Sequence, residues 1–413
     1  MKRLLITNIG ILAGINETAR ERITGADMKE LCTLKNAWLL AEDDLIKDYG
    51  PMSGLKDTRA DETIDAKGGI VLPGFCDSHT HIVYAGSREG EFVDKINGLS
   101  YVEIAKRGGG ILNSADRLHK ATEDELYAQA MGRVEEMISS GTTAAEIKSG
   151  YGLNLEDELK MLRVIRRLKE TALMTIRATF LGAHAVPREY IGRQGEYVDL
   201  ICKEMIPAVG REKLADFIDV FCDKGFFTVP ETEKMLEAGA KYGLKPKIHA
   251  NELALSGGIQ AGVKYGALSV DHLEFTGEEE IAALLKSATM PTLLPGAAFF
   301  LEMDYPPARK MIDSGLGVAL ASDFNPGSSP SGNMKLVLSI ACIKMKMTPN
   351  EAINAATLNG AYAMGMQKEH GEIKKGKRAD LIITKPVSSL EFLPYAYGSM
   401  LTTMVFKSAK RAF

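Results

Sequence analysis

Short apolar runs alternate with amphipathic segments through most of the chain. Eight runs lie at residues 69–79, 143–148, 174–184, 217–223, 244–250, 267–272, 289–295 and 316–323. Strands that alternate with helical segments are typical of parallel βα units. Eight such units predict an α/β fold, a closed (β/α)8 TIM barrel. A doubly wound open sheet would need a glycine-rich fingerprint after its first strand, and none is present there.

The two ends of the chain have a different pattern. Residues 1–68 and 369–413 contain short apolar runs that Gly, Asp, Asn and Pro interrupt, as in small β-domains. We expect these ends to pair in a small β-sandwich domain, with the barrel formed by residues 69–368. The first run, MKRLLITNIGILAG, is broken by polar residues, so it predicts a strand rather than a signal peptide.

Composition narrows the class of protein. Hydrophobic residues at 45% and charged residues at 25% are ordinary for a soluble globular chain, and no apolar stretch is long enough to span a membrane. A net charge of −4 over 413 residues argues against broad binding to nucleic acid or to a membrane surface. The five scattered cysteines indicate reduced thiols in the cytoplasm.

Side chains that can carry chemistry gather where the predicted barrel strands end. His79 and His81 point the same way if they lie in a strand, because side chains alternate between its faces. Four other runs end at His184, His249, His272 and Asp323. Active sites of barrel enzymes lie at this C-terminal face. Five of the seven histidines are there, which packing alone does not explain.

Three imidazoles and one carboxylate suit zinc or iron and leave a position for water, as in catalytic metal sites. A metal in such a site lowers the pKa of its water from ~16 toward ~7. We predict that one divalent or trivalent ion, zinc or iron, is bound by His79, His81, His249 and Asp323.

Three further strand-end residues have candidate roles. His272 is either a fifth ligand or a general base for the metal water, and Glu252 can move a proton to a ring nitrogen. Lys148 also ends a strand run, in the second barrel strand. That position is far from a bridge between ligands of the first and fifth strands, so we expect Lys148 to pair with Glu146 or with solvent.

Several motifs resemble those of a known family. PGFCDSHTHIVYAGSR, RGGGI, EIKSGYGL, FLGAHAVP, KIHANE, DHLE and SDFNPGSSP follow one another from about residue 70 to 335, and GEIKKGKRADL follows near the end. The histidine pair and GKRADL are similar to the amidohydrolase superfamily in its mononuclear branch. AGSR, KSGYG and DFNPGSS are more selective and resemble the imidazolonepropionase family.

This resemblance implies hydrolysis of the ring amide of 4-imidazolone-5-propanoate to N-formimidoyl-L-glutamate, a step in histidine degradation. It implies that a metal-bound hydroxide attacks the ring carbonyl, that His272 and Asp323 handle the proton, and that Glu252 assists ring opening. It also implies zinc or iron, a cytoplasmic setting and a homodimer. Matching the motifs residue by residue assigns substrate contacts to Arg88, Tyr151, His184, Glu252, Asn325, Gly327 and Ser328.

The chemistry of these residues agrees with such a substrate, a flat ring amide with a carboxylate tail. The planar fork of Arg88 can hold the carboxylate in two parallel hydrogen bonds. His184 can donate to the developing oxyanion or to the ring. The segment 325–329 offers backbone N–H groups where barrels often bind anions. The segment 107–111 is either a mobile lid or a plain flexible turn.

Two other functions compete with this one. A nucleobase aminohydrolase, such as a cytosine or guanine deaminase, shares the histidine pair and the late His and Asp. Arg88 together with Tyr151 argues against it, because a neutral base has no carboxylate to hold. A non-enzymatic scaffold on the same fold is free to lose metal ligands, and this chain keeps every one.

Overall fold

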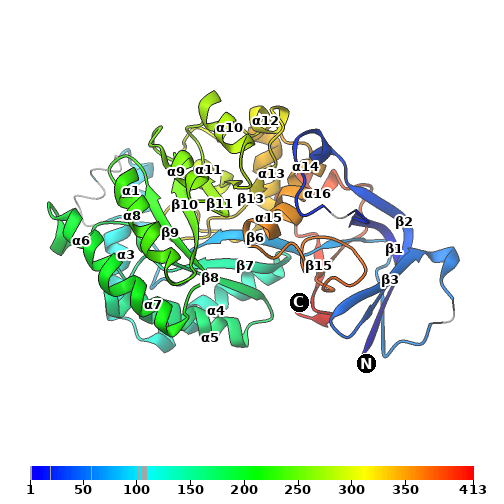
Figure 1. Ribbon diagram of the computed structural model, residues 1–413. Helices are drawn as coiled ribbons and strands as arrows, with labels where there is room; N and C mark the ends of the chain where they lie inside the picture. The colour runs from blue at the N-terminus through cyan, green and yellow to red at the C-terminus, as the bar shows by residue number, and fades with distance from the viewer. Residues whose placement is uncertain (1, 19, 57, 100–102, 104–108) are drawn as a thin grey trace.

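The computed structural model describes residues 2–413 except 19, 57, 100–102 and 104–108. Its strands form two eight-stranded sheets. One is a barrel wrapped by helices, and the other lies beside it and contains both ends of the chain (Figure 1). Among the described residues, no helix combines the length and the apolar character needed to cross a membrane.

All eight predicted runs contain a barrel strand, and every neighbouring pair is parallel. The strands are β6 (Phe75–Thr80), β7 (Thr142–Lys148), β8 (Thr175–Ala183), β9 (Phe217–Cys222), β10 (Lys245–Ala250), β11 (Ser269–His272), β12 (Met290–Leu293) and β13 (Ala319–Leu320). The ring closes just beyond β13, where Thr80 and Phe324 form a parallel bridge. The prediction of a (β/α)8 barrel is therefore confirmed.

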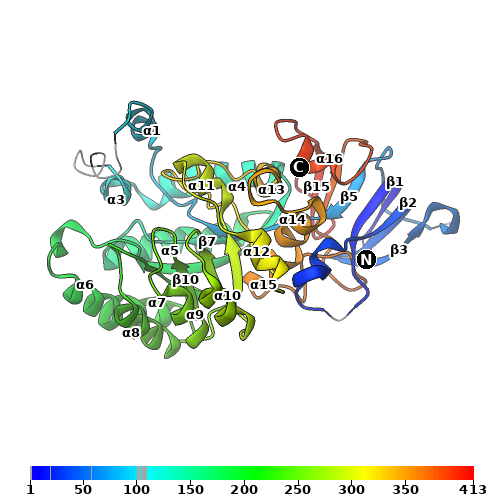
Figure 2. The same ribbon diagram turned by 90° about the horizontal axis from the view of Figure 1, so that it is seen from above.

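Helices cover the outside of the barrel (Figure 2). In the first half α1 (Glu89–Ile96) stands apart from the barrel, and the other helices are α3 (Ile111–Lys120), α4 (Glu123–Ser139), α5 (Leu155–Thr171), α6 (Gln194–Leu200), α7 (Ile206–Glu212) and α8 (Val229–Ala240). In the second half they are α9 (Gly258–Lys264), α10 (Glu278–Leu285), α11 (Pro295–Leu301), α12 (Ala308–Asp313), α13 (Met334–Met345), α14 (Pro349–Ala356) and α15 (Leu358–Ala363). The short α16 (Phe392–Tyr395) follows near the C-terminus.

The second sheet joins the two chain ends, as the sequence predicted. Its strands are β1 (Arg3–Ile15), β2 (Cys32–Glu42), β3 (Leu45–Pro51), β4 (Glu62–Asp65), β5 (Ile70–Pro73), β14 (Leu381–Thr384), β15 (Thr402–Lys407) and β16 (Lys410–Arg411). Their order is β16-β15-β14-β5-β1-β2-β3, and β4 pairs with β1. The link between the ends is β5, which pairs with β1 on one side and with β14 on the other.

One predicted strand is in fact two. The run 69–79 contains β5 of the end sheet and β6 of the barrel, so the chain changes sheets within it. Gly74 lies at the change, and a Cβ there would be 2.1 Å from the hydroxyl of Thr143 on β7. Only glycine lets the backbone pass this close to the neighbouring strand.

Alternate side chains of these strands enter different cores. Val71 and Leu381 pack within the core of the end sheet, whereas Leu72 and Ile382 belong to the core shared with the barrel. The two-residue period of a strand produces this division. One face of the end sheet is therefore attached to the barrel by apolar packing.

Candidate active site

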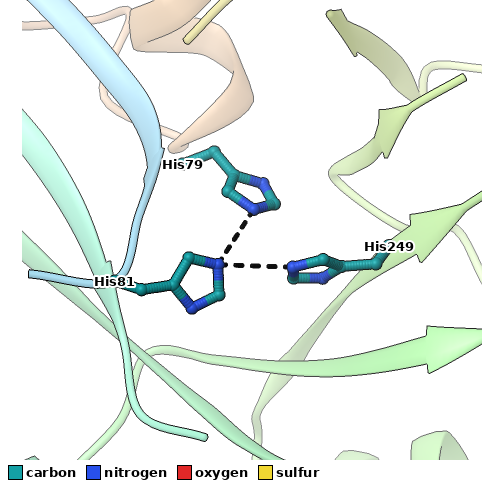
Figure 3. Close-up of side chains that lie close together, drawn as sticks. All are labelled: His79, His81 and His249. Atoms are coloured by element: carbon teal, nitrogen blue, oxygen red, sulfur yellow. Dashed lines mark hydrogen bonds between the residues drawn. The ribbon is translucent and has the colours of Figure 1, made fainter. Parts of the chain in front are cut away.

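Five side chains converge at the C-terminal edge of the barrel, and they are His79, His81, His249, His272 and Asp323. Figure 3 shows the imidazoles of the first three pointing toward one another. Nε2 of His81 lies 3.2 Å from Nε2 of His79 and 3.4 Å from Nε2 of His249. The Oδ1 atom of Asp323 is 3.6 Å from Nε2 of both His79 and His81.

Carboxylates behind two of the rings decide which nitrogen faces the site. Nδ1 of His79 is 2.6 Å from Asp271 Oδ2, and Nδ1 of His249 is 2.9 Å from Asp219 Oδ2. A carboxylate only accepts, so Nδ1 of His79 carries the proton and its Nε2 presents a lone pair. The Asp219 carboxylate beside Nδ1 of His249 favours the same tautomer of that ring. Both lone pairs point at Nε2 of His81, where a single N–H can serve only one of them.

A metal ion accounts for this arrangement. An ideal tetrahedral zinc site with Zn–N bonds of about 2.0–2.1 Å spaces its ligand nitrogens about 3.3 Å apart. A histidine must also be neutral to bind a metal. Burial, together with the nearby Lys148 ammonium, holds the pKa of His79 well below its usual value. Burial and the neighbouring His184 do the same for the pKa of His81. The residues present therefore fit a bound metal.

A second group of titratable side chains lies beside the imidazoles. Nε2 of His272 is 3.7 Å from Glu252 Oε2, and its Nδ1 is 3.8 Å from Glu274 Oε2. Burial opposes charge on His272, but the carboxylates of Glu252, Glu274 and Asp323 outweigh it and raise its pKa to about 10. Burial raises the pKa of Glu252 to about 7, so this carboxyl can give and take a proton near neutral pH.

His272 also lies near the metal group. One of its ring nitrogens is within 4.8 Å of ligand atoms of His79 and Asp323. His272 and Asp323 both have positive φ angles, +85° and +53°. Residues other than glycine adopt this conformation mostly where the surrounding structure enforces it. The backbone turns sharply at both residues as the chain leaves the strand.

A cavity of about 570 Å³ opens above the imidazoles. All seven predicted substrate contacts line it, and they are Arg88, Tyr151, His184, Glu252, Asn325, Gly327 and Ser328. Apolar and aromatic residues complete the walls, among them Phe92, Phe221, Phe226, Phe300 and Met303. A few polar groups in a largely apolar cavity are typical of a site for a small molecule.

Arg88 has a partner that the sequence did not suggest. Its Nε and Nη2 donate to Glu91 Oε2 at 3.0 and 2.6 Å. Glu91 also accepts from Asn113 Nδ2 at 2.9 Å and from the backbone N–H of Gly110. The Nη1 end of Arg88 lies against Gly327, where a Cβ would be 2.1 Å from it. Glu91 thus fixes one edge of the guanidinium in the cavity wall.

His184 presents a hydrogen-bond acceptor to the cavity, whereas the sequence predicted a donor. Its Nδ1 lies 2.9 Å from the carbonyl oxygen of Gly150, which can only accept, so Nδ1 carries the hydrogen. Burial lowers the pKa of His184 to about 3, so the ring is neutral. Its Nε2 is therefore an acceptor toward the cavity, where the sequence suggested a donor. The ring stacks on His81 with centroids 5.2 Å apart.

The segment after the last strand does not leave its amides free for an anion. The backbone N–H groups of Gly327 and Ser328 both donate to Asn325 Oδ1 at 2.8 Å. The Ser328 hydroxyl donates to Asp323 Oδ2 at 3.3 Å. Two of the amides expected to bind an anion in the segment 325–329 are therefore occupied, in an Asn turn that also holds Asp323.

Two of the remaining expectations concern segments near the site. Lys148 pairs with Glu146 at 2.5 Å, as predicted. The expectation that Lys148 lies far from the first- and fifth-strand residues was wrong, because its Nζ is also 2.8 Å from Asp219 Oδ2, which contacts His249. Of the glycine segment 107–111, residues 107 and 108 lie outside the described residues, so its role as a lid or a turn stays a prediction.

Sequence reasoning missed Asp219 and Asp271, which hold the two ligand imidazoles. Asp219 stands within the apolar strand FIDVFC, and Asp271 lies in the short buried strand SVDH, directly before His272. A carboxylate inside a buried strand costs free energy unless it is paired. An aspartate within a predicted buried strand was therefore the signal in the sequence that could have identified these two residues.

The fold and the site together define a metal-dependent hydrolase of the barrel type. A family model described as the amidohydrolase family matches residues 70–411. An imidazolonepropionase from Flavobacterium johnsoniae is 58% identical over 397 residues, which cover 96% of this chain and 97% of that protein. One from Christiangramia forsetii is 54% identical over 407 residues and covers 98% and 99%. The chain belongs to the amidohydrolase family and, within it, to the imidazolonepropionases.

Solved structures agree on the fold. An adenosine deaminase from Xanthomonas campestris with bound zinc superposes with a TM-score of 0.71, covering 99% of this chain and 92% of that one. The two sequences are 17% identical, so this likeness shows the architecture alone. Identity of fold therefore does not separate the two competing enzymatic functions.

Proposed function

We propose that this chain hydrolyses the ring amide of 4-imidazolone-5-propanoate to N-formimidoyl-L-glutamate, a step in histidine degradation. The observation that carries the proposal is the pairing of two features in one cavity. Three imidazole Nε2 atoms converge at its floor, and the guanidinium of Arg88 lies in its wall. The relatives named imidazolonepropionase support the same substrate.

His79, His81, His249 and Asp323 would hold one zinc or iron ion. When bound, the ion supplies a Lewis acid that makes water a nucleophile at neutral pH. The protein contributes ligand nitrogens already aimed at one point, because Asp271 and Asp219 hold the far sides of two rings. Less free energy is then lost in ordering the ligands when the ion binds.

The residues of the cavity orient the substrate. Arg88 binds the propanoate carboxylate through donors that Glu91 leaves free. His184 accepts an N–H of the imidazolone ring at Nε2, because its Nδ1 is used by Gly150. Burial raises the pKa of Tyr151 far above its usual value, so its hydroxyl stays protonated and can donate to a substrate oxygen.

His272, Asp323 and Glu252 handle the protons. His272 and Asp323 would handle the proton of the attacking water, because a cation bound beside His272 would oppose the protonation that its neighbouring carboxylates favour. Glu252 returns a proton to the ring nitrogen as the C–N bond breaks. The pKa of Glu252, about 7, suits a group that changes protonation during each turnover.

A direct assay tests the function. The purified protein is mixed with imidazolonepropanoate, and loss of the ring is followed by its ultraviolet absorbance. Ammonia release from a panel of purines and pyrimidines tests the deaminase alternative in parallel. Ammonia release from a base, without loss of the imidazolone, would establish the deaminase. Absence of bound metal and of both activities would point to the scaffold.

We also propose that the protein is a cytoplasmic homodimer. Its five cysteines are free thiols, in keeping with a reducing compartment. Family resemblance supports the dimer. Light scattering on the purified protein measures the oligomeric state, and elemental analysis distinguishes zinc from iron. A monomer at micromolar concentration would contradict the proposed assembly.

A further inference from the structure

Five ionisable side chains lie beneath the imidazoles, inside the barrel. The chemistry described above uses only two of them, the aspartates that contact ring nitrogens. The five side chains come from β7, β9, β10 and β11, each is at most 1% exposed, and they are Glu146, Lys148, Asp219, Lys247 and Asp271. Burying charges at this depth costs free energy unless each is paired with another. The arrangement of the pairs indicates what the cluster does.

The Lys148 ammonium contacts the two carboxylates that hold the metal-site imidazoles. Its Nζ lies 2.8 Å from Asp219 Oδ2 and 3.7 Å from Asp271 Oδ2. These are the same two oxygen atoms that meet Nδ1 of His249 at 2.9 Å and Nδ1 of His79 at 2.6 Å. One cation therefore lies behind two ligands that come from opposite sides of the barrel.

The second lysine is placed differently. Lys247 Nζ donates to Glu146 and, at 2.8 Å, to the carbonyl oxygen of Ser78. It is 3.8 Å from Asp271 Oδ2, and among the described residues its ion pairs are with Glu146 and Asp271 only. Lys247 is as buried as Lys148 and shares the partner Glu146, but it does not contact Asp219.

We propose that Lys148 is a positioning residue of the metal site: it holds Asp219 and Asp271 so that His249 and His79 present Nε2 to one ion. Without this cation, two carboxylates face each other in the barrel with less compensation and turn away from the imidazoles. The rings then lose the partners that fix their orientation and tautomer. This proposal rests on the metal site of the proposed function.

The test compares Lys148→Met with Lys247→Met, two changes of equal size in the same buried cluster. Each protein is freed of metal with a chelator, and its affinity for Zn²⁺ is measured by competition with a chromophoric chelator. Unfolding of the metal-free forms by urea gives their stabilities. We expect Lys148→Met to lose about 10- to 100-fold in Zn²⁺ affinity, the usual cost of removing an outer-shell partner. Lys247→Met should lose stability to a similar degree and keep nearly the parental affinity.

If Lys148 has only a structural role, Lys148→Met will be less stable than the parent but will have the same Zn²⁺ affinity as Lys247→Met. Equal affinity losses, or parental affinity in Lys148→Met, would overturn the proposal. If Lys148→Met does not fold, Lys148→Gln keeps an N–H donor without the charge and should show a smaller loss in the same direction. Parental affinity in Lys148→Gln would then overturn it. Failure of the proposed metal site can be told apart from failure of the proposed role of Lys148, because in the first case the parent protein would not bind Zn²⁺.

Discussion

A buried group of one histidine, one aspartate and one lysine occurs twice in the molecule, once beneath the cavity and once beside the end sheet. In the first, Asp219 contacts His249 Nδ1 at 2.9 Å and Lys148 Nζ at 2.8 Å. In the second, Asp380 contacts His370 Nδ1 at 2.8 Å and Lys407 Nζ at 2.7 Å. Each is a histidine, an aspartate and a lysine with almost the same spacing.

The surroundings of the two histidines differ. His249 Nε2 faces the Nε2 atom of another histidine at the floor of a cavity. His370 belongs to no metal-ligand group among the described residues, and Asp380 also accepts from the backbone N–H of Ser408, which ties β14 to the strand end at β15. A buried His–Asp–Lys cluster is therefore not a functional site by itself. The group beneath the cavity differs because its histidine converges with other histidines on one point, and this convergence indicates a functional site.

The largest effect is expected from removing a converging imidazole. His249→Ala should abolish turnover and lower bound metal together, because it removes one of the three nitrogens. His370→Ala, the matching change in the other cluster, should keep the metal. Elemental analysis and the ultraviolet assay measure both. Normal metal content with near-parental turnover in His249→Ala would remove it from the ligand set.

His272→Ala should leave the three-nitrogen group in place and still slow the reaction strongly. Loss of a general base typically costs ~10²–10⁴-fold in kcat. The measurement is kcat with saturating metal, and metal content serves as the control. If His272 is instead a ligand, metal content will fall along with kcat. A loss under about tenfold with normal metal would mean that another group takes the proton.

Arg88→Met should act on the substrate tail and not on the metal. It removes a charge-assisted pair worth roughly 1.5–3 kcal/mol, which corresponds to about 10- to 200-fold in kcat/KM. Arg88→Lys should recover part of this, because a point charge replaces the planar fork. An imidazolone analogue without the carboxylate should show a smaller penalty. The same penalty on both substrates would give Arg88 a structural role and reopen the deaminase alternative.

His184→Phe should have a milder effect. It keeps a ring that stacks on His81 but removes the acceptor at Nε2. A neutral hydrogen bond contributes about 0.5–1.5 kcal/mol net, so we expect a loss of about 2- to 12-fold in kcat/KM. His184→Gln, which offers an amide oxygen, should lose less. A loss beyond about a thousandfold would show that His184 stabilises charge in the transition state.

Asp380→Asn should affect turnover least and stability most. It breaks the buried ion pair of Asp380 with Lys407 on β15, a change that typically costs about 3–5 kcal/mol of unfolding free energy. Metal content and kcat of the folded protein should stay at the parental level. Urea unfolding and the ultraviolet assay measure the two quantities. A drop in bound metal would show that the two clusters are coupled.

Much of the barrel was predictable because its strands are buried on both faces. Such strands are nearly continuous apolar runs, and all eight could be located by that feature. The break at Gly74 was not predictable, because the apolar run continues from β5 into β6. The strand pairings show that the chain changes sheets there, and the close approach of Thr143 explains why the residue at the change is glycine.

The sequence by itself determined that five histidines and Asp323 meet at one mouth, since the carboxyl ends of parallel barrel strands face the same side. It also indicated a carboxylate-binding arginine through AGSR. It did not determine the polarity of His184 or the occupied amides of the 325–329 turn. Those depend on hydrogen-bond partners that the local pattern does not specify.

The tertiary structure alone decided that Nε2 of His79 and of His249 faces the point where the imidazoles converge. Asp271 is 192 residues from His79, and strand pairing sets its position. His249 on β10 is in register with Asp271 on β11, and Lys247 is in register with Asp219 on β9. A shift of one residue would turn these side chains to the other face of the barrel. Register across strands is a property of the folded sheet, and no short stretch of sequence contains it.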